Sequence, residues 1–277
     1  MTVREIYVRR DGDRFRVIAR TRDLEQGFDE KAQTWAAKFG DRPRGVRCTA
    51  AVFAFRHHES VCVVGQAADL GDGPDPPLGF HFLLIDRRDY PGDPFAIADR
   101  FPPNWNASGD LDPLDWSAEP PPRRTVEPLQ QLLKAGDSSL LLGRAQALLD
   151  GNKVLLESPA PDPDTVRALW QLLPDAVRYT QFPATFAFSN DLGFDVVVLP
   201  PDGGVEPRRS PGYLTADQAR DYPEGRYELA LQTAIEAGDP REVDRLFARR
   251  TSQDTLRLAV TMLVLAVIVA VTVKVLF

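Results

Sequence analysis

Short apolar stretches of strand length, bounded by turn-forming residues, occur along the first hundred residues, which is typical of β-strands. The first two stretches, residues 5–10 and residues 14–21, look like strands joined by a DGD turn, and the next three, Thr49–Arg56, Ser60–Gln66 and Phe80–Asp86, are apolar strand candidates. Between the second and third stretches the apolar positions, Phe28, Ala32, Trp35, Ala36 and Phe39, change to helical spacing. A helix is therefore predicted over residues 28–39. Residues 1–100 form the first predicted subdomain, a β-rich α+β unit.

A proline-rich connection, residues 101–126, separates this unit from a second one over residues 127–204, where helical and strand patterns are mixed. The helical patterns are Glu127–Ala135, Ser138–Asp150 and Asp162–Leu173, and the strand patterns are Asn152–Glu157, Thr185–Ser189 and Phe194–Leu199. A loop over residues 205–225 and a helical stalk over residues 226–255 follow, with helices predicted at Arg226–Ala237 and Pro240–Arg250. The predicted fold class is α+β: mixed or antiparallel sheets with flanking helices, in two subdomains of one compact region.

The last stretch, residues 256–277, is apolar on every face, and no charge, proline or glycine occurs between Leu258 and Val273. As a helix, residues 258–277 would be roughly 30 Å long, the thickness of a bilayer's hydrocarbon core. This predicts a C-terminal transmembrane helix, although a buried helix of a soluble core is the alternative. Its anchoring residues would be Leu258, Leu263, Leu265, Val267, Ile268 and Val273. Ala266 and Ala270 form a small-xxx-small pair, which would let two anchors associate weakly as a homodimer.

Basic residues flank the apolar run unevenly. Arg249, Arg250 and Arg257 precede it, and Lys274 lies near its far end. The N-terminus has no apolar signal-peptide core, so we expect a single-pass protein with its large domain in the cytoplasm. The arginines would set this topology, or would also contact anionic headgroups of the lipid bilayer.

Composition excludes some kinds of partner. The net charge of -7 gives no reason to expect a nucleic-acid partner. The two cysteines, Cys48 and Cys62, are too far apart for a CxxC motif and lie in apolar runs, where we expect buried thiols; a disulfide between adjacent strands is the alternative.

Few residues suggest chemistry. No phosphate-binding loop, GxGxxG, HExxH or GxSxG motif occurs, and no cofactor or metal site is predicted. His81 lies between two phenylalanines on a predicted strand, and Asp86 follows it. His81 is interpreted as a structural, hydrogen-bonded residue, as a ligand or partner contact, or as a catalytic base acting with Asp86. Trp105 and Trp116, in the proline-rich connection, either pack back onto the domain or contact a partner.

Three segments resemble a bacterial family. They are PPLGFHFLLIDRRDYPG (residues 76–92), VRALWQLLPDAVRYTQFPATFAFS (residues 166–189) and FDVVVLPPDGG (residues 194–204). Together they are similar to the N-terminal region of GTPase-associated proteins of predicted conflict systems, over roughly residues 14–204. The resemblance implies an adaptor that binds a small GTPase-like protein and other accessory modules, with no known chemistry. The chain departs from the family in its predicted membrane helix.

Two functions remain open at this point. The first is a membrane-tethered cytoplasmic adaptor or scaffold that binds a protein partner in a GTPase-associated conflict, defence or signalling system, and that is not an enzyme. The second is a membrane-associated hydrolase that uses His81 with Asp86. The adaptor is favoured, and the position of His81 separates the two: a hydrolase needs it in an open cleft, whereas a structural histidine lies in a packed interior.

Overall fold

The computed structural model of the chain describes residues 2–25, 27–73, 75–116, 124–201, 212–223 and 225–248. The first half contains β1 (Thr2–Asp11), β2 (Arg14–Thr21), α1 (Phe28–Lys38), β3 (Ala51–His58), β4 (Val61–Asp69), β5 (Leu78–Asp86), α2 (Pro94–Arg100), β6 (Gly109–Leu111) and β7 (Leu114–Asp115). The second half contains α3 (Val126–Ala135), α4 (Ser138–Leu149), β8 (Lys153–Glu157), α5 (Pro163–Leu172), α6 (Asp175–Thr180), β9 (Pro183–Ala184), β10 (Val196–Leu199), β11 (Tyr213–Leu214), α7 (Ala216–Arg220), α8 (Arg226–Ala237) and α9 (Pro240–Phe247).

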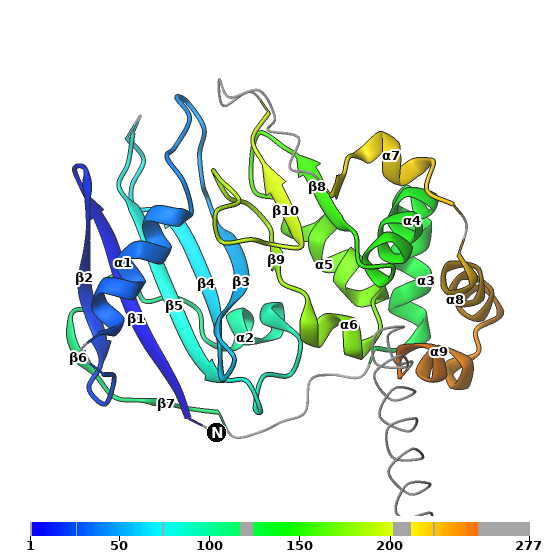
Figure 1. The fold of residues 1–277 in the computed structure, drawn as a ribbon, viewed down its shortest axis with the longest axis horizontal. Helices are drawn as coiled ribbons and strands as arrows, with labels where there is room; N and C mark the ends of the chain where they lie inside the picture. Colours follow the sequence, from blue (N-terminus) through cyan, green and yellow to red (C-terminus); the bar gives the residue numbers. More distant parts are fainter. Residues whose placement is uncertain are drawn as a thin grey trace, which may run out of the picture.

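The strands of the described residues join in one mixed sheet of eleven strands (Figure 1). Their order is β11-β8-β10-β9-β3-β4-β5-β1-β2-β6, and β7 pairs with β1. The strands from β3 to β2 are antiparallel, whereas β9, β10, β8 and β11 are parallel. The two series meet where Phe53 of β3 pairs with Ala184 of β9. The two halves of the sequence therefore complete one sheet.

Helix α1 covers the first face of the antiparallel strands (Figure 1). Its buried side chains recur at helical spacing, so they form one stripe toward the sheet. Within this stripe Trp35 meets Phe82 of β5 edge to face, at 5.5 Å between ring centroids, and Phe39, which follows the helix, meets Phe80 at 5.3 Å. Strand alternation places Phe80 and Phe82 on this face together, and leaves His81 on the other.

The second face of the same strands is covered by α2 and by the connection that follows it. Asp93 caps α2, since its carboxylate accepts hydrogen bonds from the backbone N–H groups of Phe95 and Ala96. Ile97 of the helix then packs with Leu83 and Ile85 of β5 in a second apolar cluster. Both faces of the central strands are thus buried, which explains why β4 and β5 read as nearly continuous apolar runs.

The expected fold class is corrected in two respects. The two halves share one mixed sheet, and do not form separate sheets. The expected class also included a transmembrane helix, but none of the helices in the described residues is long and apolar enough to cross a bilayer. The residues of the expected anchor and its basic flank, from Arg249 to Lys274, lie outside the described residues. The expected single-pass membrane localisation is therefore not retained. The expected lipid contacts and the pairing through Ala266 and Ala270 also fall outside the described residues and stay predictions.

Candidate functional site

His81 lies in a packed interior, on the second face of β5, with no exposed surface. Its Nε2 is 2.8 Å from a carboxylate oxygen of Glu5 on β1, and its Nδ1 is 3.4 Å from the side-chain nitrogen of Gln66 on β4. An amide nitrogen only donates, so Nδ1 accepts and Nε2–H donates to Glu5. Burial lowers the pKa of His81, and the hydrogen bond to Glu5 opposes this only in part. The imidazole is therefore held neutral, in one tautomer.

The same buried group holds the connection after α2 against the sheet. Gln66 donates to the carbonyl of Phe101 at 2.8 Å, and the hydroxyl of Tyr7 accepts from the backbone N–H of Asn104 at 3.1 Å. The Tyr7 ring stacks on His81 at 4.3 Å between centroids, and burial raises the pKa of Tyr7 to about 12. The arrangement is that of a structural polar network, in which every member has a partner.

The two tryptophans of this connection pack back onto the domain. Trp105 meets Tyr7 edge to face at 6.4 Å and is half-buried. Trp116 is buried in the second apolar cluster, where its ring lies 5.7 Å from that of Phe101. Both side chains therefore contribute to packing of residues 101–116 on the sheet.

Asp86 is not brought to His81. The two residues are five positions apart on β5, so strand alternation directs them to opposite faces of the sheet. Asp86 bonds instead to Arg88, whose Nη2 is 2.9 Å from a carboxylate oxygen, and the hydrogen bonds from Arg88 lower the pKa of Asp86 to about 2. The pair on which acid–base chemistry was predicted is not formed.

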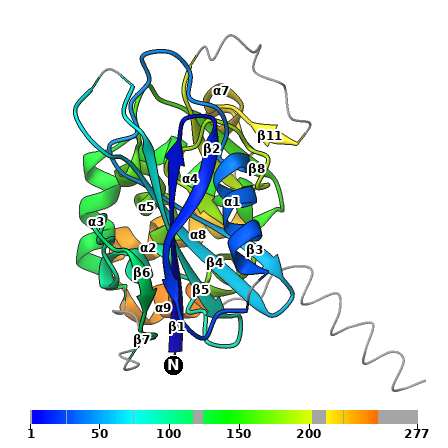
Figure 2. The same ribbon diagram turned by 90° about the vertical axis from the view of Figure 1, so that its left-hand side faces the viewer.

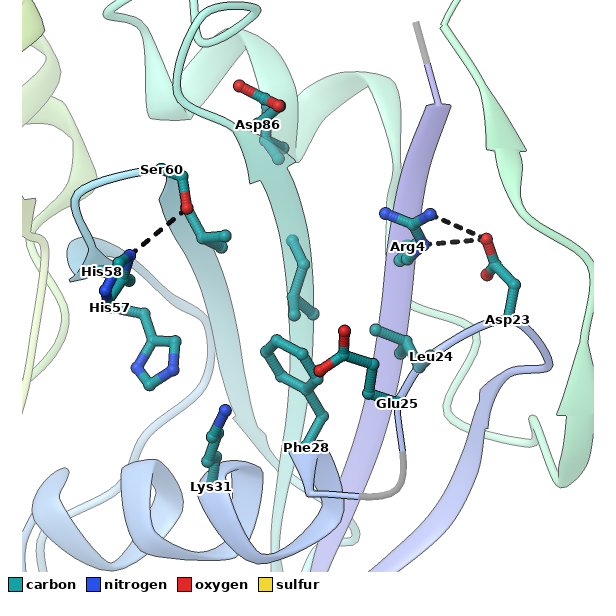
Figure 3. Close-up of a pocket in the computed structure, with 13 residues that line it drawn as sticks. Arg4, Asp23, Leu24, Glu25, Phe28, Lys31, His57, His58, Ser60 and Asp86 are labelled. Carbon is teal, nitrogen blue, oxygen red and sulfur yellow. Dashed lines mark hydrogen bonds and ion pairs between the residues drawn. The ribbon is translucent and has the colours of Figure 1, made fainter.

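An open cleft lies instead on the first face, where the N-terminal turn of α1 approaches the ends of β1, β4 and β5 (Figure 3). We call it the α1 cleft. Its volume is about 390 Å³. The side chains that line it are Arg4, Asp23, Leu24, Glu25, Phe28, Lys31, His57, His58, Ser60, Val61, Leu84, Ile85 and Asp86. These residues come from β1, the β2–α1 connection, α1, the β3–β4 hairpin and β5, so only the folded chain assembles them.

The floor of the α1 cleft is aromatic and aliphatic. The His57 ring meets Trp35 at 4.9 Å and Phe28 at 5.9 Å, both edge to face, and the ammonium of Lys31 lies 4.3 Å from the Phe28 ring centre. Burial lowers the pKa of His57, and the charge of Lys31 adds to this effect. The floor therefore combines the apolar Phe28 ring with a neutral imidazole, which still carries one N–H donor and one nitrogen acceptor.

The rim of the α1 cleft is charged and exposed. Arg4 pairs with Asp23 at 2.9 Å, with each side chain 44% exposed, and Lys31 stands on the opposite side of the opening, with Glu25 between them (Figure 3). Such pairs contribute little to stability in water. Their side chains are thus able to exchange partners with a ligand at small cost.

The α1 cleft also contains a serine beside a histidine, but their geometry favours binding over catalysis. Nδ1 of His58 is 3.4 Å from the hydroxyl of Ser60, in the same turn. In the part of the chain that the structure describes, His58 has no hydrogen-bonded carboxylate to orient it, and no three side chains of metal-binding type gather. A triad needs such an orienting third group.

Sequence reasoning missed this cleft. It placed Phe28 on the apolar stripe of a helix, because the pattern of one segment does not show which distant segment lies beside it. The one available signal was the pair of adjacent histidines in a hairpin next to apolar strands.

No protein-family model matches the chain, and no curated protein shows significant similarity to it. The resemblance to the GTPase-associated proteins therefore stays a prediction.

Proposed function

We propose that this chain is a protein-binding adaptor domain and that the α1 cleft is its docking site. The observation that supports this most directly is the combination of an apolar floor with a rim of exposed charges. Protein interfaces have this organisation: an apolar centre that excludes water, surrounded by polar groups that fix orientation. The α1 cleft lies near the lower end of the usual size range of small-molecule pockets, so it suits one protruding side chain better than a large cofactor.

The partner we propose is a small GTPase-like protein of a bacterial GTPase-associated system. This part of the proposal rests on the sequence resemblance. A partner that fits the cleft places an apolar side chain on the floor formed by Phe28 and His57. It also presents an acidic group to Lys31 and a basic group to Glu25. An exposed loop with this composition would satisfy both parts of the site.

The hydrolase alternative has little support in the geometry. It depended on His81 acting with Asp86, and these residues lie on opposite faces, with His81 buried among Glu5, Gln66 and Tyr7. A substrate has no route to an imidazole without exposed surface.

Binding to a purified small GTPase-like protein of a bacterial GTPase-associated system tests the proposal. Lys31→Glu reverses an exposed rim charge, and we expect it to weaken binding about tenfold, the effect of placing like charges across an interface. Lys38→Glu is the matched control, because Lys38 is also exposed on α1 but does not line the α1 cleft. Titration calorimetry of the wild-type chain and both variants, with circular dichroism to check folding, measures this.

Either of two results would overturn the proposal. The first is that the wild-type chain does not bind the GTPase-like protein. The second is that Lys31→Glu and Lys38→Glu reduce binding equally, which would place the contact elsewhere on α1.

A further inference from the structure

The β2 edge of the sheet is only partly covered. Strand β6 pairs with β2 at three positions, from Ala19 to Thr21, and β7 pairs with β1. In the described residues no strand lies beside the remaining stretch, Arg14–Ile18, and Figure 2 shows this upper part of β2 at the front of the molecule. An edge strand turns alternate N–H and C=O groups outward, so this stretch is a template for a further strand.

The side chains of this edge are strongly basic. Residues 9–16, RRDGDRFR, contain four arginines and two aspartates in a chain whose net charge is -7. Arg9 of β1 and Arg16 of β2 are direct partners across the two strands. Like charges in this position repel each other. Among the described residues neither Arg9 nor Arg16 has a carboxylate within ion-pair distance, and both are exposed.

A second cleft, of about 1020 Å³, opens beside these arginines. Arg9, Arg10, Arg16 and Ile18 line it from the hairpin together with Asp11 and Asp13, and the loops after α1 and before β5 line the other side. The aspartates of those loops are already engaged: Asp41 pairs with Arg10 at 3.7 Å, and Asp75 pairs with Arg42 at 3.2 Å. Among the described residues none of the aspartates that line this cleft pairs with Arg9 or Arg16, so these two guanidinium groups are available to an anion.

We propose that the open stretch of β2 binds an extended acidic segment of a partner protein as an added strand. The backbone of the segment would pair with Arg14–Ile18, and its carboxylates would lie over Arg9 and Arg16, whose planar guanidinium groups bind carboxylates in bidentate fashion. The same arginines keep two β2 edges from pairing with each other, because a second copy would bring arginine to arginine. The edge is thereby selective for an acidic strand.

This surface does not share a residue with the α1 cleft, so the inference stands independently of the proposed function.

The probes that test the inference are two short labelled peptides, one alternating glutamate with threonine and one alternating lysine with threonine. Fluorescence anisotropy compares their binding, and hydrogen exchange of the backbone amides of Arg14–Ile18 reports whether a strand is added. We expect the acidic peptide alone to bind and to protect these amides.

The double variant Arg9→Glu/Arg16→Glu tests the role of charge. We expect it to bind the acidic peptide roughly tenfold or more weakly, since one exposed ion pair contributes up to about fivefold, and to bind the basic peptide instead. Arg56→Glu/Arg226→Glu is the matched control, because it changes the net charge equally at exposed positions outside the cleft. We expect it to behave as the wild-type chain does.

Three results would overturn the inference. The acidic peptide would bind no better than the basic one, or it would bind without protecting the amides of Arg14–Ile18, or a single-stranded oligonucleotide would bind in its place. The last result would assign the arginines to nucleic acid and not to a protein segment.

Discussion

The chemistry of a single residue in this protein is decided by the face of the sheet on which it lies. His81 follows Phe80 and precedes Phe82, and alternation places its ring among Glu5, Gln66 and Tyr7. There the imidazole of β5 links Glu5 of β1 with Gln66 of β4. It accepts a hydrogen bond from Gln66, and an imidazole accepts a hydrogen bond only when it is neutral. His57 is half-buried between Phe28 and Trp35 on the other face and stays in contact with solvent.

The buried position of His81 predicts a dependence of stability on pH. Burial lowers its pKa in the folded protein below the ordinary value of 6.5, and unfolding restores that value. Below about pH 6.5 the unfolded chain therefore binds a proton that the folded chain does not, so the free energy of unfolding falls as the pH is lowered through this range. Urea unfolding between about pH 7.5 and pH 5 measures the slope.

Replacing His81 and His57 in turn separates their contributions to the pH dependence of stability. His81→Asn is expected to destabilise the protein at neutral pH by about 1–3 kcal/mol, since Glu5 and Gln66 lose their buried partner, and to flatten the pH dependence. His57→Asn should flatten it less, because that ring is half-exposed although its pKa is also lowered. If His81→Asn keeps the full wild-type slope, another group causes the pH dependence.

At the scale of elements, hydrophobic periodicity predicted much of the fold. The helix predicted over residues 28–39 is observed as α1 (Phe28–Lys38), and strands are observed near all five predicted positions of the first hundred residues. The helical patterns of the second half correspond to α3, α4, α5, α8 and α9. These segments have long stripes or alternations that face a core, which is the property that periodicity detects.

The strand predicted at Thr185–Ser189 is wrong. The strand in this region, β9, is Pro183–Ala184, and the phenylalanines after it are turned inward by irregular backbone. The N–H groups of Phe188 and Ser189 both donate to the carbonyl of Phe39 after α1, at 2.9 Å. Alternating apolar residues here fill the space between α1 and the sheet, and do not continue a strand. Because this pairing joins segments far apart in the sequence, local pattern does not reveal it.

The junction between β3 and β9 predicts the effect of removing one hydroxyl. The Thr185 hydroxyl oxygen accepts from the backbone N–H of Val52 at 2.9 Å, and the N–H of Thr185 donates to the Val52 carbonyl at 2.8 Å. Thr185→Val retains the shape but leaves the Val52 N–H without its acceptor, so we expect a loss of about 1–2 kcal/mol of unfolding free energy. Chemical denaturation measures it.

Thr34→Val is the control for this substitution. Thr34 is exposed on α1 and its hydroxyl donates only to the carbonyl of Glu30, which is already inside the helix. Its replacement should change the stability by no more than about 0.5 kcal/mol. Equal effects of the two substitutions would show that the Thr185 hydroxyl does not hold the junction.

At the scale of the whole molecule, neither the α1 cleft nor the continuous sheet was visible in the sequence. The cleft brings together Arg4, Phe28, His57 and Asp86, which belong to four separate elements, and no local motif specifies that meeting. The sheet was missed for a related reason: the two predicted units are separated by a proline-rich connection, which is typical of a boundary between domains.

Contacts across this apparent boundary are extensive. The indole N–H of Trp170 donates to the Gly92 carbonyl at 2.9 Å, and Arg178 forms an ion pair with Asp93 at the start of α2. One apolar core extends from Ile6 and Phe39 of the first half to Leu156 and Val196 of the second half, alongside the sheet. The two halves thus bury each other's apolar surface.

This shared core predicts that the two halves unfold as one unit. Opening one half would expose the apolar face of the other and the unpaired edge of β3, so partial unfolding should be as costly as complete unfolding. Native-state hydrogen exchange measures this: the most protected amides of β4 and of β10 should exchange with the same free energy of opening.

A chain shortened to residues 1–116 is the second test, and it should lack a cooperative transition because β3 loses β9 and Phe39 loses Phe188. A shortened chain that melts cooperatively, or a β10 that opens well below β4, would show that the proline-rich connection does separate two independent domains.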